Sequence, residues 1–167
     1  MTYCLPGNVR DSSPLSGAPG SQPAMDDAPI EFRRGEFVVT TDRSRMQADA
    51  ALALLHTTFW ARDMKRDVLA RAMANSVCFG LLNRDILIGF GRAVTDLATY
   101  AYWTDVVIAE AYRGRGLGGW LSECMLAHPG LKGLRRVALL TRDAAGLYAG
   151  VGFTVGPGTL IYMEHRP

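Results

Sequence analysis

The chain has 167 residues, of which 49% are hydrophobic, and this length and composition suit a single domain with a full core. The net charge is +2, so we expect no nucleic-acid partner, because a nucleic-acid-binding surface needs clustered basic residues. No apolar run approaches the length of a membrane span, and we therefore expect no membrane association.

Residues 1–28 carry prolines among glycines and serines with little hydrophobic periodicity, and a segment of this composition cannot bury a core. We predict a flexible tail over residues 1–28 and one folded domain over residues 29–167. The tail has no apolar stretch typical of a secretory signal, which favours a cytoplasmic protein.

The cysteines and histidines are widely spaced, without the pairing that metal sites and redox motifs need. They are Cys4, Cys78, Cys124, His56, His128 and His165. We interpret Cys78 and Cys124 as small core residues of a protein in a reducing compartment, and we predict no metal site.

The first part of the domain predicts a strand and two helices. A β-branched run at residues 36–41 is typical of a strand, and Asp42 or Ser44 can cap the helix that follows. Apolar residues at helical spacing extend this helix to Phe59, and a second, shorter pattern covers residues 65–75.

Three strands connected by turns come next. Residues 76–82 and 86–94 form a predicted hairpin, and residues 100–108 supply its third strand. Asp96 lies between the last two strands, where we expect it to be a turn residue.

The last part of the chain alternates helices with strands. Residues 117–127 predict a helix that ends before Pro129, and residues 136–141 predict a strand that is parallel to residues 100–108, because a crossover helix connects them. Asp143 can cap a further helix that Gly152 terminates, and residues 154–155 and 160–164 predict a final hairpin. This order of elements predicts an α/β fold, a mixed sheet with helices on its faces.

The most informative segment is VVIAEAYRGRGLGGWL, residues 106–121. A β-branched run is followed by a glycine-rich loop and then by an apolar helical pattern. Glycines let the backbone approach a ligand closely, and a helix that starts there presents unpaired N–H groups and the positive end of its dipole. With Arg113 and Arg115 beside these groups, the loop predicts a site for a phosphate or pyrophosphate.

The glycine spacing allows two interpretations of the ligand. Gly114, Gly116 and Gly119 match the G-x-G-x-x-G pattern of dinucleotide-binding folds, which would make the protein a nucleotide- or NAD-binding oxidoreductase. However, residues 109–113 separate the strand from the first glycine, and the strand at residues 136–141 does not end in an acidic residue. The alternative spacing, Arg113-x-x-Gly116-x-Gly118, fits better.

This second spacing resembles the central motif of the GNAT superfamily of acetyl-CoA-dependent N-acyltransferases. The later segment L-Y-x-x-x-G-F, from Leu147 to Phe153, resembles a second signature of the family. The resemblance runs from about Phe37 to the C-terminus. It implies a twisted, mostly antiparallel mixed sheet of six or seven strands, flanked by about four helices, and acetyl-CoA as the cosubstrate.

The resemblance also implies how the cosubstrate is held. Two parallel strands, residues 102–108 and 136–141, would splay apart, so that the free backbone of the first can pair with the amide-rich pantetheine arm. The glycine loop would hold the pyrophosphate through backbone N–H groups. The implied cofactor-binding residues are Val106, Val107, Ile108, Arg113, Gly114, Arg115, Gly116, Leu117, Gly118 and Gly119.

Tyr148 is the best candidate for a catalytic side chain, because the family commonly places a tyrosine here near the cofactor sulfur. Acyl transfer from a thioester to an amine expels a thiolate, which a phenol within hydrogen-bond reach can protonate. The alternative is an aromatic side chain that only packs on the sheet.

Asp105 is the second catalytic candidate, because a carboxylate in an apolar strand is costly to bury unless it is paired. It can bind or deprotonate the incoming amine, or it can pair with an arginine such as Arg92 on the adjacent strand. Trp60, Tyr102 and Trp103 are candidates for the wall of an acceptor pocket.

We therefore expect an acetyl-CoA:amine N-acetyltransferase without a covalent enzyme intermediate, favouring a small cationic amine, with a protein N-terminus or lysine as the alternative acceptor. A regulatory module that binds acyl-CoA without catalysis is a further alternative. Thr141 stands where many family members carry an asparagine, which makes close kinship with ribosomal N-terminal acetyltransferases doubtful. A homodimer is compatible with the family.

Overall fold

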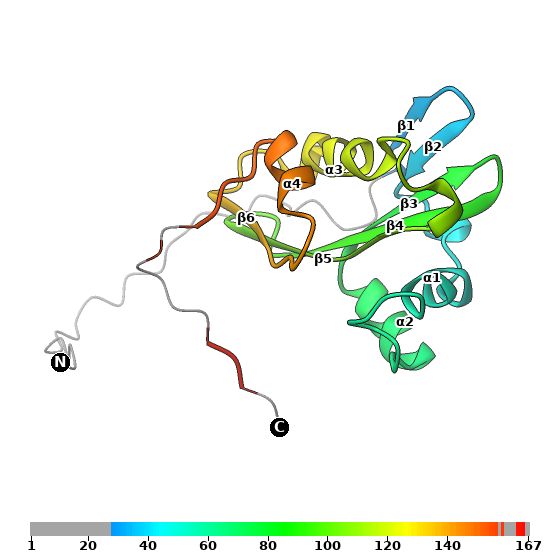
Figure 1. Cartoon of the computed structure of the whole chain (residues 1–167), viewed down its shortest axis with the longest axis horizontal. Helices are drawn as coiled ribbons and strands as arrows, with labels where there is room; N and C mark the ends of the chain where they lie inside the picture. Colours follow the sequence, from blue (N-terminus) through cyan, green and yellow to red (C-terminus); the bar gives the residue numbers. More distant parts are fainter. Residues whose placement is uncertain (1–27, 157, 159–162, 166–167) are drawn as a thin grey trace, which may run out of the picture.

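The structure is a computed structural model that describes residues 28–156, 158 and 163–165. A six-stranded sheet forms the middle layer, with α3 and α4 on one face and α1 and α2 on the other (Figure 1). The expected α/β fold with a mixed, mostly antiparallel sheet is confirmed.

Each strand of the sheet pairs with the next strand along the chain. The first five strands run antiparallel, and the last pair is parallel, as the crossover helix predicts. The strands are β1 (Glu31–Arg34), β2 (Phe37–Thr40), β3 (Val77–Asn83), β4 (Ile86–Thr95), β5 (Tyr100–Ile108) and β6 (Arg136–Leu139).

Four α-helices and three 3₁₀ turns connect these strands in the described part of the chain. The helices are α1 (Ala48–Leu55), α2 (Arg66–Ala74), α3 (Leu117–Ala127) and α4 (Ala145–Gly150). The 3₁₀ turns are η1 (Arg43–Arg45), η2 (Glu110–Tyr112) and η3 (Pro129–Leu131).

The sheet buries one hydrophobic core on each face. Phe79 and Trp103 pack under α3 with Leu121 and Met125, whereas Phe90 faces the core under α1 and α2. Cys124 belongs to the first core and Cys78 to the second, and both are buried free thiols, as expected.

The structure adds a strand that the sequence pattern did not predict. The expected strand at residues 36–41 is present as β2, but β1 precedes it as the edge strand of a hairpin with Gly35 at the turn (φ +60°). Three of the four residues of β1 are charged, so it has no apolar run, and only Phe32 packs against a core. Backbone pairing with β2 stabilises this strand more than burial does.

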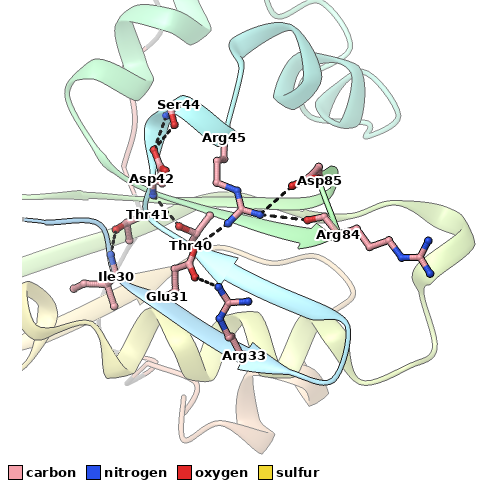
Figure 2. A network of polar contacts seen from close by, with 10 residues as sticks. All are labelled: Ile30, Glu31, Arg33, Thr40, Thr41, Asp42, Ser44, Arg45, Arg84 and Asp85. Atoms are coloured by element: carbon pink, nitrogen blue, oxygen red, sulfur yellow. Dashed lines mark hydrogen bonds and ion pairs between the residues drawn. The ribbon is translucent and has the colours of Figure 1, made fainter.

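Arg45 ties this hairpin to the neighbouring β3–β4 turn, as Figure 2 shows. Its guanidinium donates to Glu31 Oε1 at 2.7 Å and to the Arg84 carbonyl at 3.3 Å, and it lies 3.5 Å from Asp85 Oδ1. The arginine thus joins the start of β1 to the β3–β4 turn, which are distant in the sequence.

The expected cap of the first helix is wrong. Asp42 accepts from the backbone N–H of Ser44 and so caps the 3₁₀ turn η1, while α1 begins only at Ala48 and ends at Leu55. The local polar pattern stabilises a tighter turn first, and a further non-helical residue, Gln47, separates it from α1.

The C-terminal elements also differ from the prediction. β6 stops at Leu139, and Thr141, in place of Asp143, accepts the backbone N–H of Ala144 ahead of α4. That helix ends at Gly150 with Val151 as its C-cap, and Gly152 follows with a positive φ of +96°, so its expected role in terminating the helix is confirmed. Residues 154–155 form no strand in the described structure, and the tail at residues 1–27 and most of the partner segment at residues 160–164 lie outside the described residues.

Candidate active site

The central feature of the site is a separation between β5 and β6. These parallel strands pair from Tyr100 and Arg136 as far as Trp103 and Leu139, where β6 ends. β5 continues to Ile108, still paired with β4 on its other side. Within the described residues, the backbone of β5 beyond Trp103 therefore has no strand partner on the β6 side.

A β-bulge in β5 lies at this point of separation. Phe90 of β4 pairs with Val107 and Arg92 pairs with Thr104, so that Gly91 alone is opposite both Asp105 and Val106. Asp105 has a positive φ of +59°, a conformation that costs about 1–3 kcal/mol in most residues but that aspartate tolerates better. The extra residue bends β5 away from β6.

The Asp105 carboxylate forms a buried ion pair. Its Oδ2 accepts from Arg92 Nε at 2.5 Å, and the two side chains are 4% and 14% exposed. Arg92 also donates to Ser76 Oγ at 3.1 Å, and Ser76 in turn donates to the Ala72 carbonyl in α2. The expected alternative of an Arg92 partner is thus present, in a chain of hydrogen bonds that connects the bulge to α2.

The glycine loop lies between the end of β5 and the start of α3. Gly114 and Gly116 adopt φ angles of +74° and +71°, which favour glycine over other residues. Gly116 is also the N-cap of α3, and no side chain caps the helix there. The first N–H groups of α3 thus lack a capping side chain, as an anion site at a helix start requires.

The two arginines of the loop are held by local contacts. Arg113 Nε donates to the Ile108 carbonyl at 3.0 Å, and the Arg115 guanidinium lies 5.2 Å from the centre of the Tyr112 ring. Both keep positive charge beside the helix start, and the Arg113 bond connects the end of β5 to the loop.

Gly118 and Gly119 differ in what surrounds them. A Cβ on Gly118 would come within 2.9 Å of Leu147 Cδ1, so this glycine lets α4 approach α3 closely. A Cβ on Gly119 would meet no atom within 4 Å. The open side of Gly119 leaves space for a ligand, whereas Gly118 serves helix packing.

A cavity of about 440 Å³ opens where β5 and β6 separate. Its aromatic wall includes Phe59, Trp60, Tyr102 and Trp103, and Asp105 also lines it. The sequence suggested the last three of these aromatics but missed Phe59, which lies 48% exposed in edge-to-face contact with Trp60. The adjacent aromatic residues Phe59 and Trp60 are the sequence signal that could have identified it.

Tyr148 lines the same cavity from α4. Its ring packs edge-to-face against Phe153 at 5.8 Å between centres. Burial raises the pKa of the Tyr148 phenol above its ordinary value, so the hydroxyl stays protonated at neutral pH. A protonated phenol in a cavity can donate a proton to a developing anion.

The loop after β6 completes the cavity mouth. The Arg142 guanidinium stacks 3.7 Å from the centre of the Phe59 ring, and its Nη2 lies 3.5 Å from Asp143 Oδ2. Arg142 thus connects this loop to the segment between α1 and α2.

Comparisons with known proteins decide the family. Residues 74–155 match the family model of the acetyltransferase (GNAT) domain. A Gibberella zeae protein named "Putative acetyltransferase FG08082" is 33% identical over 141 residues, which cover 72% of this chain and 80% of that protein. The chain belongs to the GNAT acetyltransferase family.

The GNAT fold is also found among solved structures. A GNAT-family protein from Xanthomonas campestris pv. campestris superimposes with a TM-score of 0.71 at 38% identity, covering 77% of this chain and 93% of that one. Glucosamine-6-phosphate N-acetyltransferase from Arabidopsis thaliana shares the fold, with a TM-score of 0.58 at 17% identity over 78% of this chain and 97% of that one. This GNAT chain is therefore an acyltransferase enzyme.

The GNAT fold brings the predicted site residues together in two places. Asp105, Val106 and Tyr148 line one cavity, while the glycine loop follows the end of β5, which has no described strand partner on its β6 side.

No helix of the described residues is long and apolar enough to cross a membrane. No group of three or more acidic, histidine or cysteine residues in that part of the chain could hold a metal ion.

Proposed function

We propose that this GNAT enzyme transfers an acetyl group from acetyl-CoA to a primary amine. The observation that carries the proposal is the separation of β5 from β6 beside an uncapped helix start, with a protonated tyrosine in the cavity between the strands. A slot with a free strand edge and an anion site at one end matches a ligand with amide groups and phosphates.

The chain fits acetyl-CoA at three points. In the segment of Val106, Val107 and Ile108, the backbone groups that point away from β4 can pair with the amides of the pantetheine arm, because this side of β5 has no described strand partner. The N–H groups from Gly114 to Gly119 can hold the pyrophosphate, with the open side of Gly119 toward it. Acetyl-CoA supplies the thioester that the amine attacks.

Tyr148 acts as the general acid in this proposal. Its phenol is protonated at neutral pH like any tyrosine, and burial raises its pKa further, so the hydroxyl can give its proton to a thiolate that develops in the cavity. Delivering that proton makes the thiol a better leaving group and requires no covalent bond between enzyme and acyl group.

Asp105 enters the proposal with the two roles that its position in the sequence left open. Its carboxylate binds or deprotonates the amine, or it has a structural role in β5 through its ion pair with Arg92. The 4% exposure of the side chain and its bond to Arg92 support the second role.

The acceptor is proposed to be a small cationic amine. Trp60 lies half-exposed at the cavity, and an aromatic face attracts a cationic group, whereas Arg142 already stacks on the Phe59 ring. A protein N-terminus or lysine side chain is the competing acceptor, since the cavity is open at its mouth.

The test is ligand binding by the full chain, followed by turnover. Saturating acetyl-CoA at about 100 times its Kd adds roughly 2.7 kcal/mol of stability, or about 5–11 °C in Tm for a domain of this size. We expect this shift with acetyl-CoA and CoA and none with NAD. A shift with NAD alone would favour the dinucleotide-binding interpretation.

Turnover is then measured as thiol release over a panel of small amines, amino acids and peptides. Release with small amines, and less with peptides, supports the proposal. Binding of acetyl-CoA without release from any acceptor would favour the regulatory module that binds acyl-CoA without catalysis.

A further inference from the structure

The ion pair between Arg92 and Asp105 lies at the point where β5 changes its register. We infer that this pair holds the β5 bulge, and that Asp105 is a positioning residue that keeps the acetyl-CoA slot open. The inference rests on the proposed function, because the slot is the site proposed for acetyl-CoA.

The bulge changes which side chains of β5 face each core. Trp103 packs in the core under α3, but Val107 packs in the core under α1 and α2, although both residue numbers are odd. In a regular strand these two side chains would share a face. Beyond the bulge, Val106 and Ile108 are therefore the residues that face α3.

The same extra residue separates the strands. β5 and β6 stop pairing at Trp103, two residues before Asp105. If Asp105 returned to ordinary strand geometry, Val106 and Ile108 would turn to the other face, and the strand could continue straight beside β6. The free backbone edge proposed to bind pantetheine would then be lost.

The ion pair is the contact that holds Asp105 in its left-handed conformation. A buried carboxylate needs its partner, and Arg92 is fixed in turn by Ser76 at the end of α2. Thr104 Oγ1 donates to the other carboxylate oxygen at 3.3 Å, so both oxygens accept hydrogen bonds from protein side chains. Neither oxygen needs a substrate to be satisfied.

Three variants of the full-length enzyme separate this role from that of a base. Asp105→Asn keeps an acceptor for Arg92 and a residue that tolerates positive φ. Asp105→Ala removes both properties. The double variant Arg92→Met/Asp105→Asn breaks the pair without leaving a buried carboxylate. The matched control is Asp49→Ala, which breaks the exposed ion pair of Asp49 with Arg66.

The binding readout is the Kd for CoA by calorimetry, alongside kcat and KM. We expect Asp105→Ala and the double variant to raise the Kd and the KM for acetyl-CoA about tenfold or more, the usual scale for a misplaced binding group. Asp49→Ala should stay within about threefold of the wild type in both Kd and kcat. Asp105→Asn keeps a hydrogen bond but leaves Arg92 without its counter-charge, so we expect its Kd to lie between those of the wild type and Asp105→Ala, with any fall in kcat smaller than the rise in Kd. Circular dichroism and thermal melting establish that each variant is folded.

Hydrogen exchange of residues 104–109 without ligand gives a readout that does not depend on acetyl-CoA. We expect altered exchange in Asp105→Ala and the double variant, and no change in Asp49→Ala. If the wild type bound no CoA, the proposed function would fail, whereas the exchange data would still test whether the ion pair between Arg92 and Asp105 holds the bulge.

Two results overturn the inference. The first is a Kd and an exchange pattern that remain unchanged in folded Asp105→Ala or in the double variant. The second is a loss of kcat of about a hundredfold in Asp105→Asn with unchanged Kd, which would make Asp105 the base. If Asp105→Ala and the double variant both fail to fold, Asp105→Asn alone decides, because a base predicts a large loss of kcat at unchanged Kd and a positioning residue predicts a raised Kd with a smaller change in kcat.

Discussion

Tyr148 combines burial with access to the cavity, and this combination suits a proton donor. The raised pKa keeps the phenol protonated, and the contact with Phe153 fixes the ring. Removing only the hydroxyl should leave that packing in place. The tyrosine is therefore the residue whose chemistry can be tested with the smallest structural change.

We predict that Tyr148→Phe lowers kcat about tenfold or more, the low end of general-acid effects, and leaves the Kd for CoA unchanged. The measurement is steady-state thiol release together with calorimetric CoA binding. Tyr100→Phe is the matched control, because Tyr100 lies in β5 outside the cavity. An unchanged kcat in Tyr148→Phe would exclude the phenol from the reaction.

The start of α3 depends on glycine for its backbone conformation. Gly116 caps the helix in the left-handed region, where other residues lose about 1–2 kcal/mol. Gly146 lies in α4 with no positive φ and no neighbour within 4 Å of an added Cβ. The two positions differ in backbone conformation more than in available space.

At the start of α3, we predict that Gly116→Ala lowers the free energy of unfolding by about 1–2 kcal/mol, because a positive φ is unfavourable for alanine. Gly146→Ala should raise the free energy of unfolding by up to about 1 kcal/mol, because alanine is the better helix former. Urea unfolding of the ligand-free protein measures both. Equal effects of the two substitutions would contradict the need for a left-handed cap.

The molecule as a whole buries several groups that ionise only at high pH. Burial raises the pKa of Cys78 from 9.0 to about 11 and that of Cys124 to about 12. It also raises the pKa values of Tyr102 and Tyr148 above 10. Because each folded-state pKa is higher than the unfolded one, the unfolded chain loses these protons first as the pH rises.

Stability should therefore be fully present below pH 9 and fall between pH 9 and about 11. The rise of the Cys78 pKa from 9.0 to about 11 alone corresponds to about 3 kcal/mol over that range. Urea midpoints measured from pH 8 to 10.5 test this prediction, and Cys78→Ser should show a shallower decline than the wild type. A flat profile in the wild type would show that the thiols ionise equally in both states.

Local patterns were enough to predict most of the secondary structure. The meander from β3 to β5 and the helix α3 follow directly from apolar periodicity and turn residues, and the parallel β5–β6 pair follows from the crossover. β1 was missed because an edge strand with charged residues is stabilised by pairing that no local pattern encodes. Asp42 was misread because a 3₁₀ turn and an α-helix use the same cap.

Only the part of the site that lies in one continuous segment of the sequence could be predicted. The glycine loop is contiguous in the sequence, so its phosphate site could be proposed from spacing alone. The cavity needs Phe59, Asp105 and Tyr148 from three distant segments, and only the fold places them together. The partner of Asp105 could be named in advance because Arg92 lies on the neighbouring strand, but the bulge between them depends on register.

The sheet order follows the chain order, and this has a consequence for synthesis on the ribosome. The β1–β2 hairpin and the meander from β3 to β5 can each form soon after they emerge, because their contacts are local, and β3 joins β2 once η1, α1 and α2 have been made. β6 must wait until α3 has been made, since a parallel pair requires the crossover. The slot between β5 and β6 therefore forms only late in synthesis, and α4 must still follow to bring Tyr148 to the cavity. A nascent chain that stops before β6 carries the meander with no place for its cosubstrate.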